Sequence, residues 1–219
     1  MPDLSPDELL TTTRSVRKRL DFDRPVPRDV IRECLEIAFQ APNGSNLNTW
    51  RWVVVDDPEL IAGAAEIYNG GLDDFIETLG EATGENYMGA SIPGSERISA
   101  SVEYLRENFH RCPALLVPLM AGRCEGMNAF YQASQWGSIV QAVWSFFLAL
   151  RARGLGSAWV TGHLWREKQL ADLLGIPSGH YTQVGLFPIA YTIGTDFKPA
   201  YRKPLDEVVG WNRFEAGAD

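Results

Sequence analysis

The sequence is short of cysteine, of basic charge and of long apolar runs, and each shortage excludes a class of protein. Its 219 residues include three cysteines, Cys34, Cys112 and Cys124, with no Cys-x-x-Cys pair. Together with the three histidines they show no spacing typical of a zinc site, so we expect free thiols and no bound metal. Asp and Glu number 28 against 20 Lys and Arg. The resulting net charge of -8 argues against nucleic acid or an anionic membrane as a partner.

Targeting and membrane signals are lacking as well. The segment from Met1 to Glu8 has neither the basic nor the apolar stretch that opens a signal peptide. No run approaches the ~20 apolar residues of a membrane-spanning helix. We therefore expect a cytoplasmic protein. A chain of this length, 45% hydrophobic, can bury the core of one ordinary domain.

The apolar periodicity predicts an α+β fold. Ser5 to Glu8 matches a capping box, and we expect the first helix to continue from there to about Leu20. Because helices and strands do not alternate regularly, the sheet should be mainly antiparallel and flanked by helices, with an extended C-terminal tail. Further helices are expected after Pro27, from residue 58 and over 96–109, 128–153 and 167–174, and strands over 52–55, 114–120, 157–161 and 181–193.

Two stretches depart from this regular pattern. Residues 69–110 begin with a polar region punctuated by glycines, and we expect an insertion or lid there, with a short helix near 72–79. Pro118 lies inside an apolar run suited to a strand. Because proline cannot donate to a β-ladder, we expect an edge strand or a bulge at that position.

The longest predicted helix, 128–153, is apolar over more than one side. A chain this small has little material with which to cover such a helix. Burial in a subunit interface is the simplest solution, and the central helix of a monomer is the alternative.

Motifs of several enzyme classes are missing. Gly154-Leu155-Gly156 follows a predicted helix and opens a strand, which is the reverse of a dinucleotide-binding fingerprint, and Trp159 stands where that fingerprint needs glycine. There is no phosphate-binding loop of the GxxxxGK[ST] type, no GxSxG and no HExxH. No side chain is singled out as catalytic, so any reactive group should come from a cofactor.

Two polar segments remain as candidate binding sites. Arg14, Arg17 and their neighbours place four cations at the end of the predicted first helix, where Arg14 and Arg17 would share one face. Such guanidinium groups suit a phosphate or an electron-rich carbonyl, although cations also simply stabilise helix ends. The segment 41–50 combines three asparagines with a glycine and a serine. It suits the polar edge of a planar heterocycle, and an ordinary turn is the alternative.

Four motifs, in order along the chain, resemble those of the nitroreductase family of flavoproteins. They are Arg14-Ser15-Val16-Arg17, the segment Ala41 to Trp50, Gly154-Leu155-Gly156 leading to Thr161-Gly162, and Arg202 to Val208. Thr13, Asn43 and Ala200 differ from residues common in that family. The resemblance implies a single nitroreductase-like FMN-binding domain over 1–219, with residues 69–110 as a lid, in a homodimer that holds FMN at its interface.

The resemblance also assigns the residues that would hold the cofactor, in four groups. These are Arg14, Ser15 and Arg17 at the phosphate, ribityl chain and pyrimidine edge; Pro42, Asn43, Gly44 and Asn46 along the cofactor, partly from the partner subunit; Thr161 and Gly162 at the flavin ring; and Arg202 at the phosphate.

The activity implied is that of an FMN-dependent oxidoreductase. It would use NADPH or NADH to reduce nitroaromatic or quinone-type acceptors by ping-pong hydride transfer. A deiodinase-like or flavin-destructase-like branch of the same fold is an alternative, as is a non-catalytic protein that sequesters flavin. A helical interaction module without a cofactor is the alternative from another class.

Overall fold

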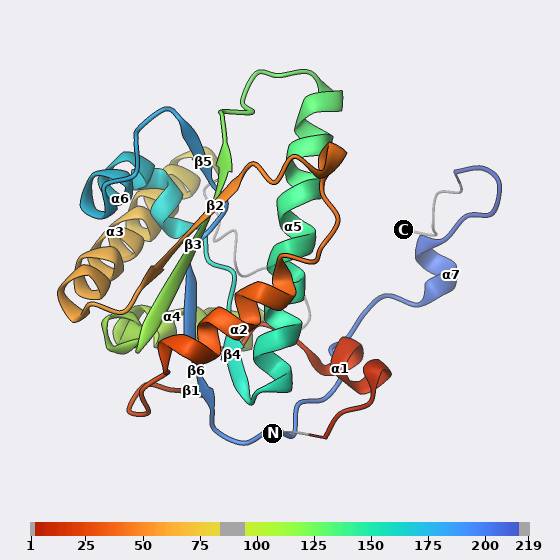
Figure 1. The fold of residues 1–219 in the computed structure, drawn as a ribbon, viewed down its shortest axis with the longest axis horizontal. Coiled ribbons are helices and arrows are strands. Elements are labelled where there is room, and N and C mark those ends of the chain that lie inside the picture. The colour runs from red at the N-terminus through yellow and green to blue at the C-terminus, as the bar shows by residue number, and fades with distance from the viewer. Residues whose placement is uncertain (1–2, 84–94, 215–219) are drawn as a thin grey trace.

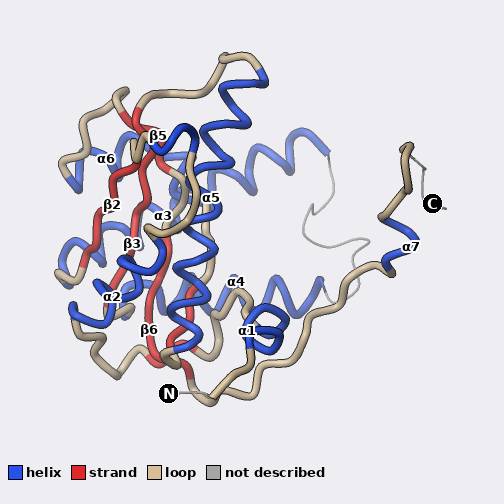
Figure 2. Tube along the Cα trace, turned by 45° about the vertical axis from the view of Figure 1, so that its right-hand side comes forward, coloured by secondary structure: helices blue, strands red, loops and turns tan. Residues whose placement is uncertain are grey.

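The structure is a computed structural model in which residues 3–83 and 95–214 are described (Figures 1 and 2). The described chain contains a six-stranded sheet whose pairings are all antiparallel. The main path runs β1-β6-β3-β2, with β4 paired to β6 and β5 paired to β3. The α+β prediction is confirmed. The strands are β1 (Leu20–Asp21), β2 (Trp50–Val55), β3 (Ala114–Ala121), β4 (Leu155–Ser157), β5 (Tyr181–Gln183) and β6 (Phe187–Thr192).

Helices cover both faces of this sheet, giving three layers (Figure 1). One buried cluster joins α2 and α5 to one face, and a second joins α3, α4 and α6 to the other. The helices are α1 (Pro6–Thr12), α2 (Arg28–Ala38), α3 (Pro58–Thr83), α4 (Ser95–Asn108), α5 (Ala129–Ala152), α6 (Glu167–Leu174) and α7 (Leu205–Val208), with 3-10 turns η1 (Gly44–Asn46), η2 (Phe109–Arg111) and η3 (Gly162–Arg166). None of the helices in the described ranges has the length and apolar character needed to span a bilayer.

The first helix is shorter than predicted. The capping box at Ser5 is present, but α1 ends at Thr12, and Thr13 has extended backbone angles. The three threonines 11–13 each turn a hydroxyl back to a carbonyl four residues earlier, and β-branched residues disfavour helix. The chain then leaves to pair with β4, where the Val16 N–H donates to the Ser157 carbonyl at 2.8 Å. The prediction that Arg14 and Arg17 share a helix face is therefore wrong.

The helix α3 continues through Gly70 and Gly71, two glycines of the stretch in which an insertion was predicted. At Gly71 a Cβ atom would lie 2.0 Å from the carbonyl oxygen of Gly162, and at Gly70 it would meet the guanidinium of Arg166. Both glycines therefore allow η3 to approach the helix. The predicted helix over 72–79 is confirmed as part of this longer helix. Residues 84–94 of the predicted insertion lie outside the described residues. The lid therefore stays a prediction.

Pro118 lies in a central strand, so the expected edge position is wrong. On one side β3 pairs with β2 along its length. On the other side it pairs with β6 through residues 114–116 and with β5 through residues 119–121. Pro118 falls between these two partners, and its carbonyl accepts a bond from the Val184 N–H at 3.0 Å. The missing N–H coincides with the change of partner, where a ladder bond is not needed.

Candidate cofactor site

The first group of predicted residues lies beside the strand β4. The bond from Val16 to Ser157 holds the segment 14–17 against this strand. At Gly156 a Cβ atom would be only 3.0 Å from Val16, so the glycine permits the contact. Val16 is buried, while Arg14 and Ser15 are exposed. The segment 14–17 therefore packs on β4, the strand that leads toward Thr161.

Arg17 carries an unmatched donor in this surface. Its Nε is buried and has no hydrogen-bond partner among the described residues. Burial lowers the pKa of Arg17, and the neighbouring Tyr68 partly offsets this. A buried guanidinium normally has an anionic or carbonyl partner, because leaving a charged donor unmatched is costly. Arg17 therefore fits the phosphate or carbonyl groups of a flavin nucleotide.

Tyr68 on α3 links Arg17 to the predicted ring-contact residues. Its ring lies 3.0 Å from where a Cβ of Gly162 would be, and burial raises the pKa of its hydroxyl to about 12. Leu72 is closer still to that position, at 2.7 Å, so Gly162 has no room for a side chain. Thr161, which precedes η3, is exposed. Gly162 thus packs against Tyr68, the same residue whose hydroxyl affects the pKa of Arg17.

Two residues of α3 near Gly162, Tyr68 and Asn69, were not predicted from the sequence. Tyr68 makes the contacts above, and the half-buried Asn69 next to it donates to the Arg106 carbonyl at 3.2 Å. The Asn69 Oδ1 is buried and unpartnered within the part of the chain that the structure describes. Both residues belong to the helix predicted from residue 58, whose end the sequence placed near Gly70 and Gly71.

His163 follows Gly162 and is completely buried. Neither ring nitrogen has a hydrogen-bond partner in residues 3–83 or 95–214. Burial lowers its pKa to about 3, so the imidazole is neutral at pH 7. It is core rather than a candidate for proton transfer, because nothing in the described chain reaches its nitrogens.

The second predicted group lies in the turn before β2. The Asn43 Oδ1 accepts from the Asn48 N–H at 3.0 Å, and its Nδ2 donates to the Asn48 Oδ1 at 3.2 Å. The Gly44 N–H donates to the Ser138 hydroxyl of α5 at 2.8 Å. Pro42 and Asn46 are exposed. Three residues in this turn have positive φ: Ser45 (52°), Asn46 (54°) and Asn48 (51°). Such an accumulation of left-handed backbone is typical of functional loops.

Within one chain the two groups lie far apart. The turn is fastened to α5 at Ser138, whereas the N-terminal segment reaches α5 at Arg151, whose Nη2 contacts the Thr12 hydroxyl. Thirteen residues separate these contacts, or roughly 20 Å of helix at the usual rise. One chain therefore does not place Asn43, Gly44 and their neighbours at the Arg17 surface.

Arg202 is not brought to either group. It lies in the exposed tail, where its side chain donates to the carbonyl of the neighbouring Tyr201. In both views the segment with α7 stands away from the body (Figures 1 and 2). The start of the tail is held, since the Arg14 Nη1 donates to the Lys198 carbonyl at 3.1 Å. The role expected for Arg202 stays a prediction.

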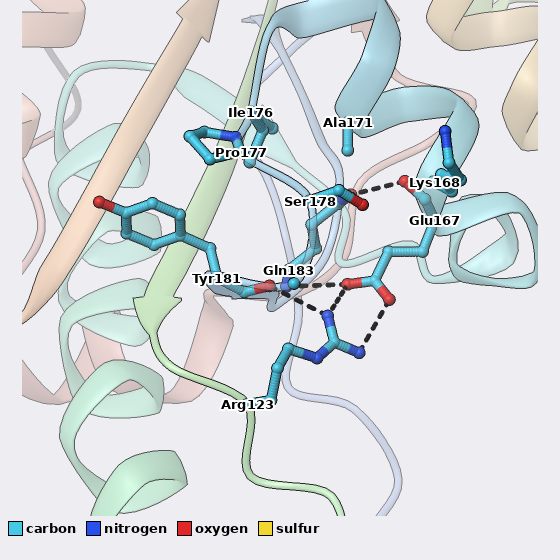
Figure 3. A pocket seen from close by; sticks show the side chains of 10 residues that line it. Arg123, Glu167, Lys168, Ala171, Ile176, Pro177, Ser178, Tyr181 and Gln183 are labelled. Carbon is cyan, nitrogen blue, oxygen red and sulfur yellow. Dashed lines mark hydrogen bonds and ion pairs between the residues drawn. The ribbon is translucent and has the colours of Figure 1, made fainter.

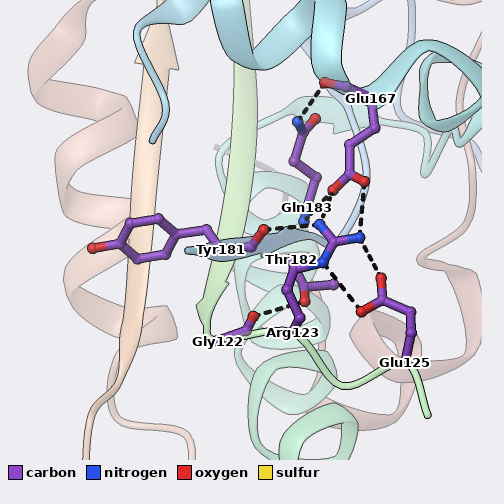
Figure 4. A network of polar contacts seen from close by, with 7 residues as sticks. All are labelled: Gly122, Arg123, Glu125, Glu167, Tyr181, Thr182 and Gln183. Carbon is purple, nitrogen blue, oxygen red and sulfur yellow. Dashed lines mark hydrogen bonds and ion pairs between the residues drawn. The ribbon is translucent and has the colours of Figure 1, made fainter. Parts of the chain in front are cut away.

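A separate cavity of about 210 Å³ lies between β5, α6 and the loop after α6 (Figure 3). Arg123 and Glu167 form its polar wall. The Arg123 guanidinium binds Glu167 at 2.6 Å, and it also binds Glu125 and the Tyr181 carbonyl (Figure 4). These partners use its donors, and the two glutamates raise the pKa of Arg123. The network therefore ties the loop after β3 to α6 and β5, and Arg123 has no donor left for a ligand.

Metal chemistry receives no support from the described side chains, which include no group of three or more His, Cys, Asp or Glu that could hold an ion. The three cysteines are buried and free. Burial raises the pKa of Cys34 to about 11, so this thiol is not a reactive thiolate at neutral pH.

Comparison with known proteins identifies the family. The profile of the nitroreductase family matches residues 10–191. The chain is 29% identical over 214 residues to an NADH dehydrogenase of Thermus thermophilus, covering 90% of this chain and 91% of that protein. It is 26% identical over 205 residues to iodotyrosine deiodinase 1 of Rattus norvegicus, covering 92% and 67%.

Solved structures show the same fold. An FMN- and NADPH-dependent nitroreductase from a Sphingopyxis strain superposes with a TM-score of 0.67 at 21% identity, covering 96% of this chain and all of that one. At this identity the likeness concerns the fold alone. Since the family profile spans most of the sequence, the chain belongs to the nitroreductase family.

Proposed function

We propose that this chain is an FMN-dependent oxidoreductase. The observation that carries the proposal is the buried Nε of Arg17, which has no hydrogen-bond partner among the described residues. Bound there, FMN would supply two-electron transfer, which no side chain of this site offers. Arg17 would hold an electron-rich part of the cofactor, and Gly162 would let it approach the backbone. Arg14 and Ser15 would add polar contacts from the same segment.

The site is completed, in this proposal, by a second copy of the chain. The turn with Pro42, Asn43, Gly44 and Asn46 lies roughly 20 Å along α5 from the Arg17 surface, as the helix rise gives. A two-fold related partner can bring its own turn to that surface. The outer side of α5 supports such an interface, because Phe130 is 72% exposed and Trp144 is 42% exposed. Large exposed aromatics on one helix are typical of association surfaces.

The electron donor in this proposal is NADPH or NADH, and the acceptor is a nitroaromatic or a quinone. The names of the relatives support this choice, since one is an NADH dehydrogenase and another an NADPH-dependent nitroreductase. A dehalogenating reaction on a halotyrosine is the second candidate, because the rat deiodinase matches 92% of this chain. In this proposal the 69–110 segment forms a wall of the acceptor site, and its shape decides whether a nitroaromatic, a quinone or a halotyrosine is bound.

Steady-state kinetics separate these functions. The FMN-loaded protein is assayed with each nicotinamide against a nitroaromatic, a quinone and an iodotyrosine. Oxidation of the nicotinamide that depends on the nitroaromatic or quinone supports the reductase, and release of iodide supports the deiodinase reaction. A flavin-loaded protein that turns over none of them would be a flavin-sequestering protein. Size measurement on the same sample should give a dimer.

A further inference from the structure

Three arginines from distant parts of the chain hold the start of the C-terminal tail. The Arg14 Nη1 donates to the Lys198 carbonyl at 3.1 Å, and the Arg151 Nη2 donates to the Thr195 carbonyl at 2.8 Å. The Arg19 Nε donates to the Ile193 carbonyl at 2.7 Å. The tail thus crosses three guanidinium groups where α1, the end of α5 and β4 meet, and its own Asp196 pairs with one of them, Arg19, at 2.6 Å.

A small, partly open cavity lies beneath this crossing. Its volume of about 10 Å³ is enough for one water-sized occupant and too small for a phosphate. Both polar and apolar side chains line it. The walls include Thr12, Thr13, Arg14, Arg151, Ser157 and Phe197.

Two buried side chains of this cavity have unmatched donors. Arg151 is only 4% exposed, yet its Nε and Nη1 have no hydrogen-bond partner among the residues described. Ser157 is 1% exposed, and its hydroxyl is equally unpartnered in that part of the chain. An occupant that accepts hydrogen bonds from Arg151 and Ser157 would satisfy both.

The charge around the cavity favours an anion over a water molecule. Arg151 forms no ion pair with a carboxylate among the described side chains, and its hydrogen bonds go to neutral oxygens. Burial and the nearby Arg19 both lower the pKa of Arg151, which means that the site disfavours another positive charge. The end of α5 supplies only a partial negative charge. Buried cations are normally paired, so a full negative charge is the missing element.

We propose that this cavity binds a small monovalent anion of halide size, most simply chloride, held by Arg151 and Ser157. The anion neutralises the buried guanidinium and so secures the point at which the tail leaves the body. This inference does not depend on the proposed flavin chemistry, because the cavity and its donors are complete in one chain.

Crystals grown in bromide and measured at the bromine absorption edge locate the occupant directly. We expect an anomalous peak within hydrogen-bonding distance of the Arg151 Nε and the Ser157 hydroxyl. A site that refines as water without an anomalous peak overturns the proposal. The flavin content of the crystals does not affect this result.

Thermal unfolding shows whether the anion matters in solution. Replacing gluconate by chloride or bromide at constant ionic strength should raise the melting temperature by about 2–4 °C. The shift should disappear in Arg151→Met and shrink in Ser157→Ala, which keeps the proposal testable if Arg151→Met does not fold. Arg153→Met is the matched control, since Arg153 pairs with Glu33 instead. A bromide peak without any halide-specific shift would mean an adventitious ion only and would overturn the proposal.

Discussion

The guanidinium of Arg151 lies 4.8 Å from the centre of the Phe197 ring, although the two residues belong to a helix and to an irregular tail. Arg19 lies over the same ring at 4.2 Å. The ring therefore joins two cations that would otherwise repel each other. A cation near an aromatic face is attracted to it by about 0.5–1 kcal/mol at a partly exposed site. Phe197 is thus the apolar anchor of the tail that carries Arg202.

Phe197→Leu should loosen this anchor while keeping much of the apolar volume. We expect a loss of about 1 kcal/mol in the free energy of unfolding. Proteolysis between residues 195 and 203 should also become faster. Phe214→Leu is the control, because Phe214 is 93% exposed and removing its ring costs nothing in a single chain. Equal protease sensitivity in the two variants would contradict the anchor.

Arg17→Met should change stability and flavin binding in opposite directions. Without flavin the variant loses a buried, unmatched donor and should be at least as stable as the wild type. With flavin it loses a hydrogen bond to a charged group, and the dissociation constant of FMN should rise about tenfold or more. Flavin fluorescence and chemical unfolding measure the two effects. Arg32→Met is the control, since Arg32 is exposed on α2 and pairs with Glu36. An unchanged FMN affinity in Arg17→Met would remove this residue from the site.

The two glycines of α3 should respond differently to alanine. In Gly71→Ala the new methyl group meets the backbone carbonyl of Gly162, which cannot move without displacing η3. We expect a loss of about 2 kcal/mol or more in the free energy of unfolding, together with weaker FMN retention. In Gly70→Ala the obstacle is the flexible guanidinium of Arg166, which can shift. Its cost should therefore be smaller. Urea unfolding of both variants gives the comparison, and the reverse order would contradict the packing of η3 on α3.

His163 should make the protein sensitive to acid. Its pKa is about 3 in the folded chain, against an unperturbed value of 6.5. Below pH 6.5 the unfolded chain therefore binds a proton that the folded chain does not. This residue costs no stability above pH 6.5, and it costs up to about 1.4 kcal/mol per pH unit as the pH falls from there toward 3. Unfolding measured from pH 7 down to about pH 5, above the range in which carboxylates titrate, should show this slope, and the slope should be smaller in His163→Leu. His180→Leu, at an exposed position, should keep it.

Local patterns were sufficient for much of the fold. The apolar period of α2 and α5 and the capping box of α1 appear in the structure as predicted. The end of α1 was misplaced because the pairing of Val16 with β4 depends on residues about 140 positions away. Gly70 and Gly71 favoured a prediction of an insertion, because the contact with η3 that explains them exists only in the folded chain. Pro118 favoured a prediction of an edge strand, because the change of strand partner beside it is a property of the whole sheet.

The candidate site was likewise predictable from local sequence only in part. The cluster of four cations and the resemblance to the nitroreductase family pointed to Arg17, although the prediction that it shares a helix face with Arg14 was wrong. Tyr68 was missed, because it packs against Gly162 only once α3 is folded against η3. The separation of Asn43 and Gly44 from Arg17 along α5 was not readable from sequence, since it follows from the length of a packed helix.

The most direct measurement is the absorption spectrum of the purified, FMN-reconstituted protein before and after anaerobic addition of NADPH or NADH. We expect a bound flavin spectrum that is bleached by at least one nicotinamide, and about tenfold or more weaker binding of the flavin in Arg17→Met. A protein that stays colourless after incubation with FMN, or whose flavin band persists with both nicotinamides, would contradict it.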